Sequence, residues 1–176
     1  MKNIIAFAGS NSENSINKQL ATYAASLVDG VDVTILDLND FELPMYSKQL
    51  EASDGIPKNA EQFLNHIRQS DGIIISLAEY NGAYTSVFKN LFDWMSRAEQ
   101  KTFLNKAMLL MATSPGARGG QSVLGIAMDR FPYHDANITG SFSLPSFNDN
   151  FKDGKLINEA LNAQLLEEVK QFQDSL

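Results

Sequence analysis

The sequence predicts a doubly wound α/β fold, with one parallel sheet of five strands and helices on both faces. Short apolar runs rich in β-branched residues alternate with longer segments of helical periodicity along the chain. Three of these runs, around IIAF, IIIS and MLLM, are continuously apolar, as expected for strands that are covered on both faces. Strict alternation of strands and helices favours a parallel sheet with right-handed crossovers.

Each expected element follows from one of these two patterns. The expected strands are Asn3–Ala8, Val31–Leu38, Gly72–Leu77, Lys106–Thr113 and Asn137–Leu144. The expected helices are Ser15–Val28, Lys58–Gln69, Tyr84–Arg97, Gln121–Arg130 and Asn158–Phe172. No repeat, linker or low-complexity segment interrupts the pattern, so we expect one domain over residues 1–176.

Composition excludes several classes of function. The chain has no cysteine, which excludes disulfides, thiolate catalysis and zinc–thiolate sites, and its two histidines are too isolated to suggest a metal centre. A net charge of −7 without runs of Lys or Arg argues against nucleic acid or an anionic membrane as partner. The apolar run Ile4–Ala8 is too short for a signal peptide or a membrane span, so we expect a cytoplasmic protein.

In such sheets ligands bind at the carboxyl ends of the strands, beside the topological switch point. The loops GSNSENS, AEYNGAYT and SPGARGG follow the first, third and fourth expected strands, so they should meet at this edge. The first loop leads into a helix N-terminus, whose unpaired N–H groups suit a phosphate. Serine and asparagine are also preferred helix caps, so this loop alone leaves a phosphate site and a simple cap both open.

The first loop lacks the G-x-G-x-x-G pattern of dinucleotide sites, which favours the phosphate of a mononucleotide. In the second loop, Asn81-Gly82 indicates a tight turn, and Tyr80 could pack near a planar heterocycle. The third loop, Ser114–Gly120, has three glycines that would let backbone approach a ligand closely, or would make a flexible connector.

Together the three loops resemble a known family. The chain contains, in order, GSNSENSIN, EYNG followed by KN-x(2)-DW-x-SR, and SPG-x(2)-GG. This order is similar to the pattern of the NAD(P)H-dependent FMN reductases of flavodoxin-like fold. That group includes bacterial quinone, chromate and azo-dye reductases. The resemblance runs from Lys2 to about Gln121, and its most specific part is EYNGAYTSVFKNLFDWMSR, Glu79–Arg97.

The resemblance implies that the first loop holds the phosphate of FMN and that the other two flank its isoalloxazine ring. The FMN-binding residues expected from the loops and the resemblance are Ser10, Ser12, Ser15, Ile16, Asn17, Glu79, Tyr80, Asn81, Gly82, Ser114, Pro115, Gly116 and Gly119. Two positions depart from the family pattern. Ser12 stands where an arginine is usual, which would weaken FMN binding, and Ala78 stands where a proline is usual.

The resemblance also implies a reaction in which NADPH or NADH reduces bound FMN. The flavin then reduces a small acceptor such as a quinone, free flavin, chromate or an azo compound. The flavin carries this chemistry, so we expect no acid–base pair, and we interpret Glu79 as a turn or inter-subunit contact and His134 as a surface histidine. The alternatives are an FMN-binding electron carrier without a nicotinamide site and a flavin-free binding protein on the same fold. Against the carrier, the short third loop offers no second aromatic wall and leaves a face open for nicotinamide.

The expected helix Tyr84–Arg97 leads to a prediction about assembly. A core-facing stripe consists of Val87, Leu91, Trp94 and Met95. Phe88 and Phe92 form a second stripe beside it, and two exposed aromatic rings on a monomer would form an apolar patch. We therefore expect a homodimer, or a dimer of dimers, with the flavin sites near the interface. The alternative is a broad face of this helix buried beneath its neighbour.

Overall fold

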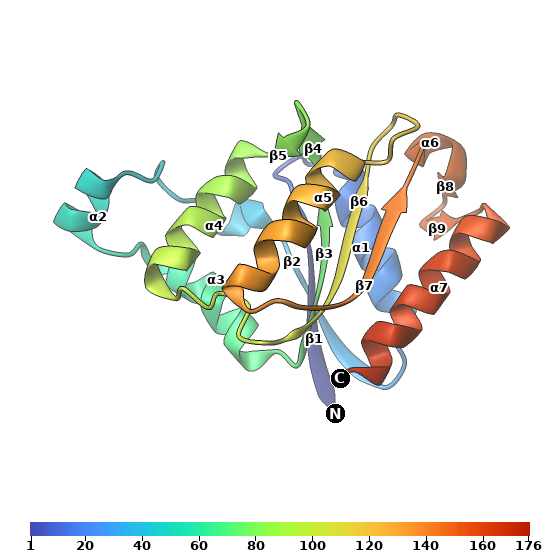
Figure 1. Cartoon of the computed structure of the whole chain (residues 1–176), viewed down its shortest axis with the longest axis horizontal. Helices are drawn as coiled ribbons and strands as arrows, with labels where there is room; N and C mark the ends of the chain where they lie inside the picture. The colour runs from blue at the N-terminus through green and yellow to red at the C-terminus, as the bar shows by residue number, and fades with distance from the viewer.

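A five-stranded parallel sheet forms the centre of the computed structural model, which describes residues 1–176 (Figure 1). Its strands are β1 (Lys2–Gly9), β2 (Val31–Leu36), β3 (Gly72–Leu77), β6 (Ala107–Thr113) and β7 (Asn137–Leu144). Their order across the sheet is β2-β1-β3-β6-β7, and every neighbouring pair is parallel. This order confirms the predicted doubly wound fold of flavodoxin type, with its switch point between β1 and β3.

Helices cover both faces of the sheet. One face is covered by α1 (Ile16–Ser26) and α7 (Glu159–Asp174), and the other by α3 (Lys58–Gln69), α4 (Ser86–Ala98) and α5 (Gln121–Arg130). Every residue of β3 and β6 is buried, because their side chains meet a helix whichever face they point to. This burial explains the continuously apolar sequences of these strands. None of the helices combines the length and apolar content needed to span a bilayer.

The predicted strands and helices are all present, with changes at some ends. The strand expected to reach Leu38 ends at Leu36, because the carboxylate of Asp37 accepts the Asn39 N–H and starts the 3₁₀ turn η1 (Leu38–Asp40).

The helix expected from Tyr84 begins at Ser86 instead, for two local reasons. Tyr84 belongs to β5 (Ala83–Tyr84), which pairs with β4 (Glu79–Tyr80) in an antiparallel hairpin. The hydroxyl of Thr85 then accepts the Phe88 N–H and caps α4.

Several short elements were not predicted from the sequence. The arm, residues 41–57, carries α2 (Lys48–Asp54), which has no buried residue and projects from the body at the left of Figure 1. Along the chain, β7 is followed by α6 (Phe147–Asn150) and by a second hairpin, β8 (Phe151–Lys152) with β9 (Lys155–Leu156). These pieces are too short to show a periodic pattern.

Side chains of α4 hold the base of the arm. The carbonyl of Pro44 accepts hydrogen bonds from Asn90 Nδ2 at 3.0 Å and from the indole Nε1 of Trp94 at 2.8 Å. The backbone N–H of Tyr46 returns a bond to Asn90 Oδ1 at 2.8 Å. One turn farther along α4, Arg97 Nε lies 3.1 Å from both carboxylate oxygens of Glu51 in α2.

The expectation that Phe88 and Phe92 are exposed on a monomer is wrong. Their rings are only 0% and 5% exposed within one chain. Both pack against Phe131, with ring centroids 6.1 and 5.5 Å away, and Phe131 begins the 3₁₀ turn η2 (Phe131–His134) after α5. The alternative of a broad buried face is confirmed, and the second stripe therefore gives no argument for a dimer.

His134 is also not the surface residue we expected. Its side chain is buried, its Nδ1 lies 2.9 Å from the carbonyl oxygen of Gln100, and its ring lies 4.7 Å from that of Phe92. The residue therefore closes the end of the aromatic cluster between α4 and η2.

Candidate functional site

A cavity of about 260 Å³ opens at the carboxyl ends of β1, β3 and β6, where the fold is expected to bind a ligand. It is lined by most of the predicted FMN-binding residues, namely Ser10, Ser12, Ser15, Ile16, Asn17, Glu79, Tyr80, Ser114 and Pro115. Asn14, Ala78 and Thr113 complete the lining. The other predicted residues, Asn81, Gly82, Gly116 and Gly119, lie in the same loops but outside the lining.

The first loop presents unused hydrogen-bond donors to this cavity. Within the chain, the backbone N–H groups of Asn14, Ile16 and Asn17 donate to no acceptor, and all three residues line the cavity. The loop is held open by its own bonds, because Ser10 Oγ accepts the Ser12 N–H at 3.1 Å and Ser15 Oγ accepts the Lys18 N–H at 3.1 Å. Ser15 is therefore the N-cap of α1, as one of the two interpretations of this loop required.

No Lys or Arg lines the cavity. The nearest cation in sequence, Lys18, forms an ion pair with Asp37, and the hydrogen bond from this ammonium group lowers the pKa of the Asp37 carboxyl. The charge of Lys18 is thus already balanced at the edge of β2. An anion in the cavity would be held by neutral donors and by the positive end of α1.

Asn17 is engaged by the protein itself. Its Oδ1 accepts from Ser76 Oγ at 2.7 Å and from the Thr113 N–H at 3.0 Å, while its Nδ2 donates to the Thr113 carbonyl at 3.2 Å. The side chain is only 2% exposed. It therefore joins the first turn of α1 to β3 and β6, and its contribution to the cavity is a backbone N–H.

The second loop is a tight hairpin that stands at the top of Figure 1. Asn81 and Gly82 are its two central residues, with φ of 53° and 75°, which is the signature of a type I′ turn. The turn leaves Tyr80 54% exposed, beside the cavity that it lines. The Asn-Gly turn predicted from the sequence is confirmed.

The third loop is fixed against the end of β7. Gly119 has a φ of 59°, and a Cβ there would lie 2.5 Å from Ser143 Oγ. Ser143 Oγ in turn donates to the Gly119 carbonyl at 2.9 Å, and the Ser146 N–H donates to the Gly116 carbonyl at 2.9 Å. These contacts make the loop a firm wall for the cavity, not a flexible connector.

Glu79 makes a contact within the chain that the sequence did not reveal. Its Oε2 accepts the N–H of Val123 in the first turn of α5 at 2.9 Å. The partners are 44 positions apart, so no local pattern marks them.

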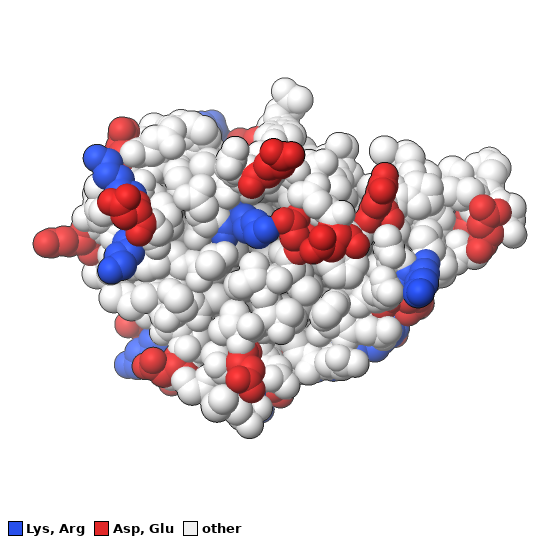
Figure 2. Space-filling model, turned by 180° about the vertical axis from the view of Figure 1, so that it is seen from behind, with Lys and Arg blue, Asp and Glu red and all other residues white.

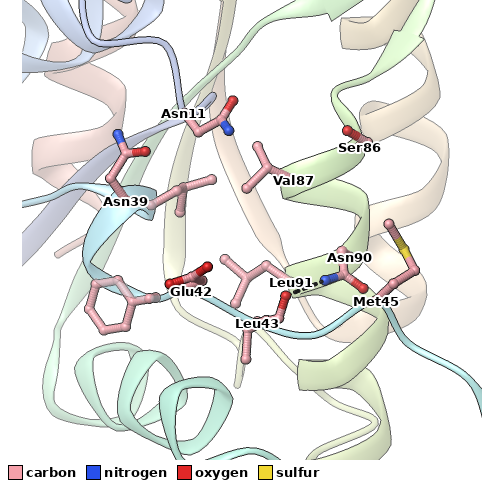
Figure 3. A pocket seen from close by; sticks show the side chains of 11 residues that line it. Asn11, Asn39, Glu42, Leu43, Met45, Ser86, Val87, Asn90 and Leu91 are labelled. Carbon is pink, nitrogen blue, oxygen red and sulfur yellow. Dashed lines mark hydrogen bonds between the residues drawn. The ribbon is translucent and has the colours of Figure 1, made fainter. Parts of the chain in front are cut away.

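A larger hollow of about 420 Å³ lies on the other side of the first loop, between the arm, η1 and α4 (Figure 3). Leu43 and Leu91 form part of its apolar floor, and Asn11, Asn39 and Glu42 stand around its opening. Only Asn11 belongs to the predicted loops, and it was not among the predicted binding residues. The larger hollow is therefore distinct from the cavity in which the predicted residues meet.

The cavity fits a phosphate carried by a planar ring system. Its first loop offers free N–H groups and serine hydroxyls at one helix N-terminus, which are groups that bind phosphate. Tyr80 and Pro115 supply apolar surface on the two other sides. The face of the molecule in Figure 2 carries acidic side chains, and its basic side chains do not gather into a patch. This face therefore has no basic patch that would compete with the cavity for an anion.

Comparisons with known proteins point to one family. The family model described as NADPH-dependent FMN reductase matches residues 2–149. The probable NADPH:quinone oxidoreductase 1 of Oryza sativa subsp. japonica is 30% identical over 184 aligned residues, which cover 98% of this chain and 89% of the rice protein. An NAD(P)H-dependent FMN reductase of Pseudomonas aeruginosa is 29% identical over 117 residues, or 66% of this chain and 62% of that protein.

A solved structure shares the fold. The flavoenzyme NAD(P)H:(acceptor) oxidoreductase FerB from Paracoccus denitrificans superposes with a TM-score of 0.78 at 23% identity, over 99% of this chain and 96% of that one. At this identity the likeness concerns the fold alone. The family match is different, because it covers most of the chain and includes all three loops of the cavity. The chain therefore belongs to the NADPH-dependent FMN reductase family.

Proposed function

We propose that this protein is an NAD(P)H-dependent FMN oxidoreductase that reduces a small acceptor such as a quinone or a free flavin. FMN occupies the cavity of about 260 Å³, and residues 1–176 form one FMN-binding domain. The observation that carries the proposal is the convergence of the three predicted loops on this cavity, with the free N–H groups of the first loop inside it. The family of the chain supports the same reaction.

Each loop has a separate task in this proposal. The N–H groups of Asn14, Ile16 and Asn17, with the hydroxyls of the neighbouring serines, hold the phosphate. Tyr80 and Pro115 border the isoalloxazine ring. When bound, FMN would supply the two-electron chemistry that links NAD(P)H to the acceptor. The protein supplies binding and orientation, and the exposure of Tyr80 leaves room for nicotinamide and acceptor to approach in turn.

We also propose a homodimer, or a dimer of dimers, in the cytoplasm. The family resemblance supports the assembly. The contact through Phe88 and Phe92 is not part of this proposal, because both rings are buried in one chain.

The test begins with purified protein. Bound flavin is released and identified, and the FMN-loaded protein is then mixed with NADPH or NADH in the presence and absence of a quinone. We expect FMN at about one per chain and steady consumption of nicotinamide that depends on the quinone. FMN binding without such turnover would favour the electron carrier, and absence of any flavin affinity would overturn the proposal.

A further inference from the structure

Glu79 connects two of the three loops that surround the cavity. It lies in β4, directly after the central strand, and its Oε2 accepts the N–H of Val123 at 2.9 Å. Val123 is in the first turn of α5, which follows directly on the third loop, Ser114–Gly120. One carboxylate therefore sets the separation between the hairpin and the third loop.

The helix that Glu79 contacts has no cap of its own. The helices α1, α4 and α7 each begin with a side-chain oxygen that accepts an N–H of the first turn, from Ser15, Thr85 and Asn158. In contrast, α5 follows Gly120, which has no side chain, and its first turn contains no acidic residue. Because the first N–H groups of a helix need outside acceptors and favour a negative charge, Glu79 supplies what α5 lacks.

Glu79 is also the only residue with an ionisable carboxylate or a cationic side chain among those that line the cavity. Tyr80 stands beside it in the hairpin, and Ser114 and Pro115 stand on the side of the third loop. Reduction adds electrons to a flavin, and a fixed negative charge nearby opposes this addition. The residue thus combines two effects on a ligand in the cavity: it sets the spacing of two walls, and it places a charge at their junction.

We propose that Glu79 is a positioning residue for FMN whose charge also favours the oxidised flavin over the reduced one. This inference rests on the proposed FMN site. The bond to Val123 keeps the walls at the spacing that the ring requires. The charge lowers the potential of the bound flavin, which makes its reduced form a stronger donor to the acceptor.

Two substitutions separate these effects. Glu79→Gln keeps a side-chain oxygen that can accept the Val123 N–H but removes the charge, whereas Glu79→Ala removes both. The chain offers a matched control in Glu168, whose Oε2 accepts the Ser141 N–H, also at 2.9 Å, and neither residue lines the cavity. The substitutions Glu168→Gln and Glu168→Ala therefore remove the same kind of carboxylate contact without touching the site.

The measurements are the melting temperature of the apo-protein, the Kd for FMN by flavin fluorescence, and the midpoint potential of bound FMN by equilibration with redox dyes. We expect Glu79→Ala to weaken FMN by about tenfold or more, as loss of a charged hydrogen bond does, and Glu168→Ala to leave the Kd unchanged. Glu79→Gln should keep the Kd within about threefold and favour reduced FMN by about tenfold, a rise of about 30 mV in potential.

Each outcome bears on the inference alone or on the site as a whole. Wild-type protein that binds no FMN overturns the proposed site. Wild-type protein that binds FMN, with Glu79→Ala binding equally well, overturns only the positioning role. An unchanged potential in Glu79→Gln, or an equal change in Glu168→Gln, overturns the role of the charge. If Glu79→Ala does not fold, Glu79→Asp shortens the side chain and tests the spacing in its place.

Discussion

At the scale of single residues, the first loop offers the cavity hydroxyls, amides and backbone N–H groups, and no Lys or Arg lines the cavity. A phosphate monoester carries a charge of about −1.5 to −2 at pH 7, which these neutral donors must stabilise together with the dipole of α1. Ser12 is exposed and lines the cavity, so a longer side chain could reach the phosphate from this position.

We predict that Ser12→Arg tightens FMN binding by up to about tenfold. The charge-assisted hydrogen bonds of the arginine contribute more binding free energy than is lost as conformational entropy when its side chain is fixed. Titration of the apo-protein with FMN and with riboflavin measures the effect. Riboflavin lacks the phosphate, so its affinity should not change. Equal tightening of both ligands would show that position 12 does not face the phosphate.

Asn17 leads to a prediction about stability. Replacement by alanine leaves the N–H and the carbonyl of Thr113 without their buried partner, which costs about 1–3 kcal/mol per unsatisfied group. We expect the melting temperature of Asn17→Ala to fall by about 2–4 °C for each kcal/mol lost. Ser76→Ala is the control, since it removes one donor to Asn17 and leaves Thr113 bonded, and its effect should be smaller. Equal effects of both substitutions would contradict this assignment.

The sequence predicted which residues gather at the cavity better than it predicted what each one does. Ser15 could be recognised as a cap because its partner, Lys18, is three positions away. The partners of Asn17 and Glu79 could not, because they are 44 to 96 positions away and meet only when the sheet is assembled.

At the scale of elements, the hairpin β4–β5 is the part of the site that depends most on backbone conformation. Gly82 has a φ of 75°, yet a Cβ at this position would meet nothing within 4 Å. The requirement for glycine is therefore conformational and does not come from packing. A β-branched residue is poorly tolerated in this region, whereas asparagine adopts it readily.

We predict that Gly82→Val reduces FMN affinity more than it reduces the stability of the apo-protein, because the hairpin is exposed and changes shape locally. Gly82→Asn should keep both properties near those of the wild type. The measurements are the Kd for FMN and the apo-protein melting temperature of each variant. Full FMN affinity in Gly82→Val would mean that the turn does not shape the ring site.

Tyr84, in strand β5 of this hairpin, has a buried hydroxyl without a hydrogen-bond partner. The hydroxyl of Tyr84 accepts and donates no hydrogen bond, and its ring stacks on Phe131 with 6.2 Å between centroids. Burial raises the pKa of Tyr84 to about 12 from 10.0. The folded protein therefore keeps this proton at a pH where the unfolded chain loses it, so this contribution to stability is present below pH 10 and is lost as pH rises towards 12.

We predict that Tyr84→Phe raises stability at neutral pH by up to about 1 kcal/mol, since it removes an unsatisfied buried polar atom. The loss of stability of the wild type above pH 10 should also be smaller in this variant. Urea denaturation at neutral pH and in this alkaline range measures both effects. A variant that is less stable at neutral pH would indicate a partner for the hydroxyl.

The helix periodicity of α4 gave the width of its apolar face but not what covers it. Phe88 and Phe92 are covered by η2, a turn of four residues that the sequence pattern did not reveal. A short 3₁₀ element has no period to detect, so the same stripe was compatible with a partner chain or with the chain itself.

At the scale of the whole molecule, the order of strands and helices was predictable because burial of both faces imposes continuous apolar runs on the inner strands. The arm was not predictable, because α2 buries no residue and the base of the arm is held by hydrogen bonds from α4 to the Pro44 carbonyl. Elements that bury little apolar surface leave little mark on the sequence.

We predict that light scattering at micromolar concentration gives a mass of two or four 176-residue chains. An assembly near the cavity should also depend on the exposed hairpin, so Tyr80→Ala would weaken association, whereas Tyr133→Ala, at another exposed tyrosine, would not. A monomer at this concentration would contradict the proposed assembly while leaving the FMN site intact.

Trp94 is the only tryptophan of the chain, so all tryptophan fluorescence of the apo-protein comes from this one residue. Its ring is fully buried, its N–H is bonded to the Pro44 carbonyl, and the ring of Tyr46 stands edge-on at 5.0 Å. Any movement that lifts the arm from α4 breaks this bond and admits water to the indole, which shifts its emission to longer wavelength. Stopped-flow recording of that shift would time the opening and closing of the arm in unlabelled protein.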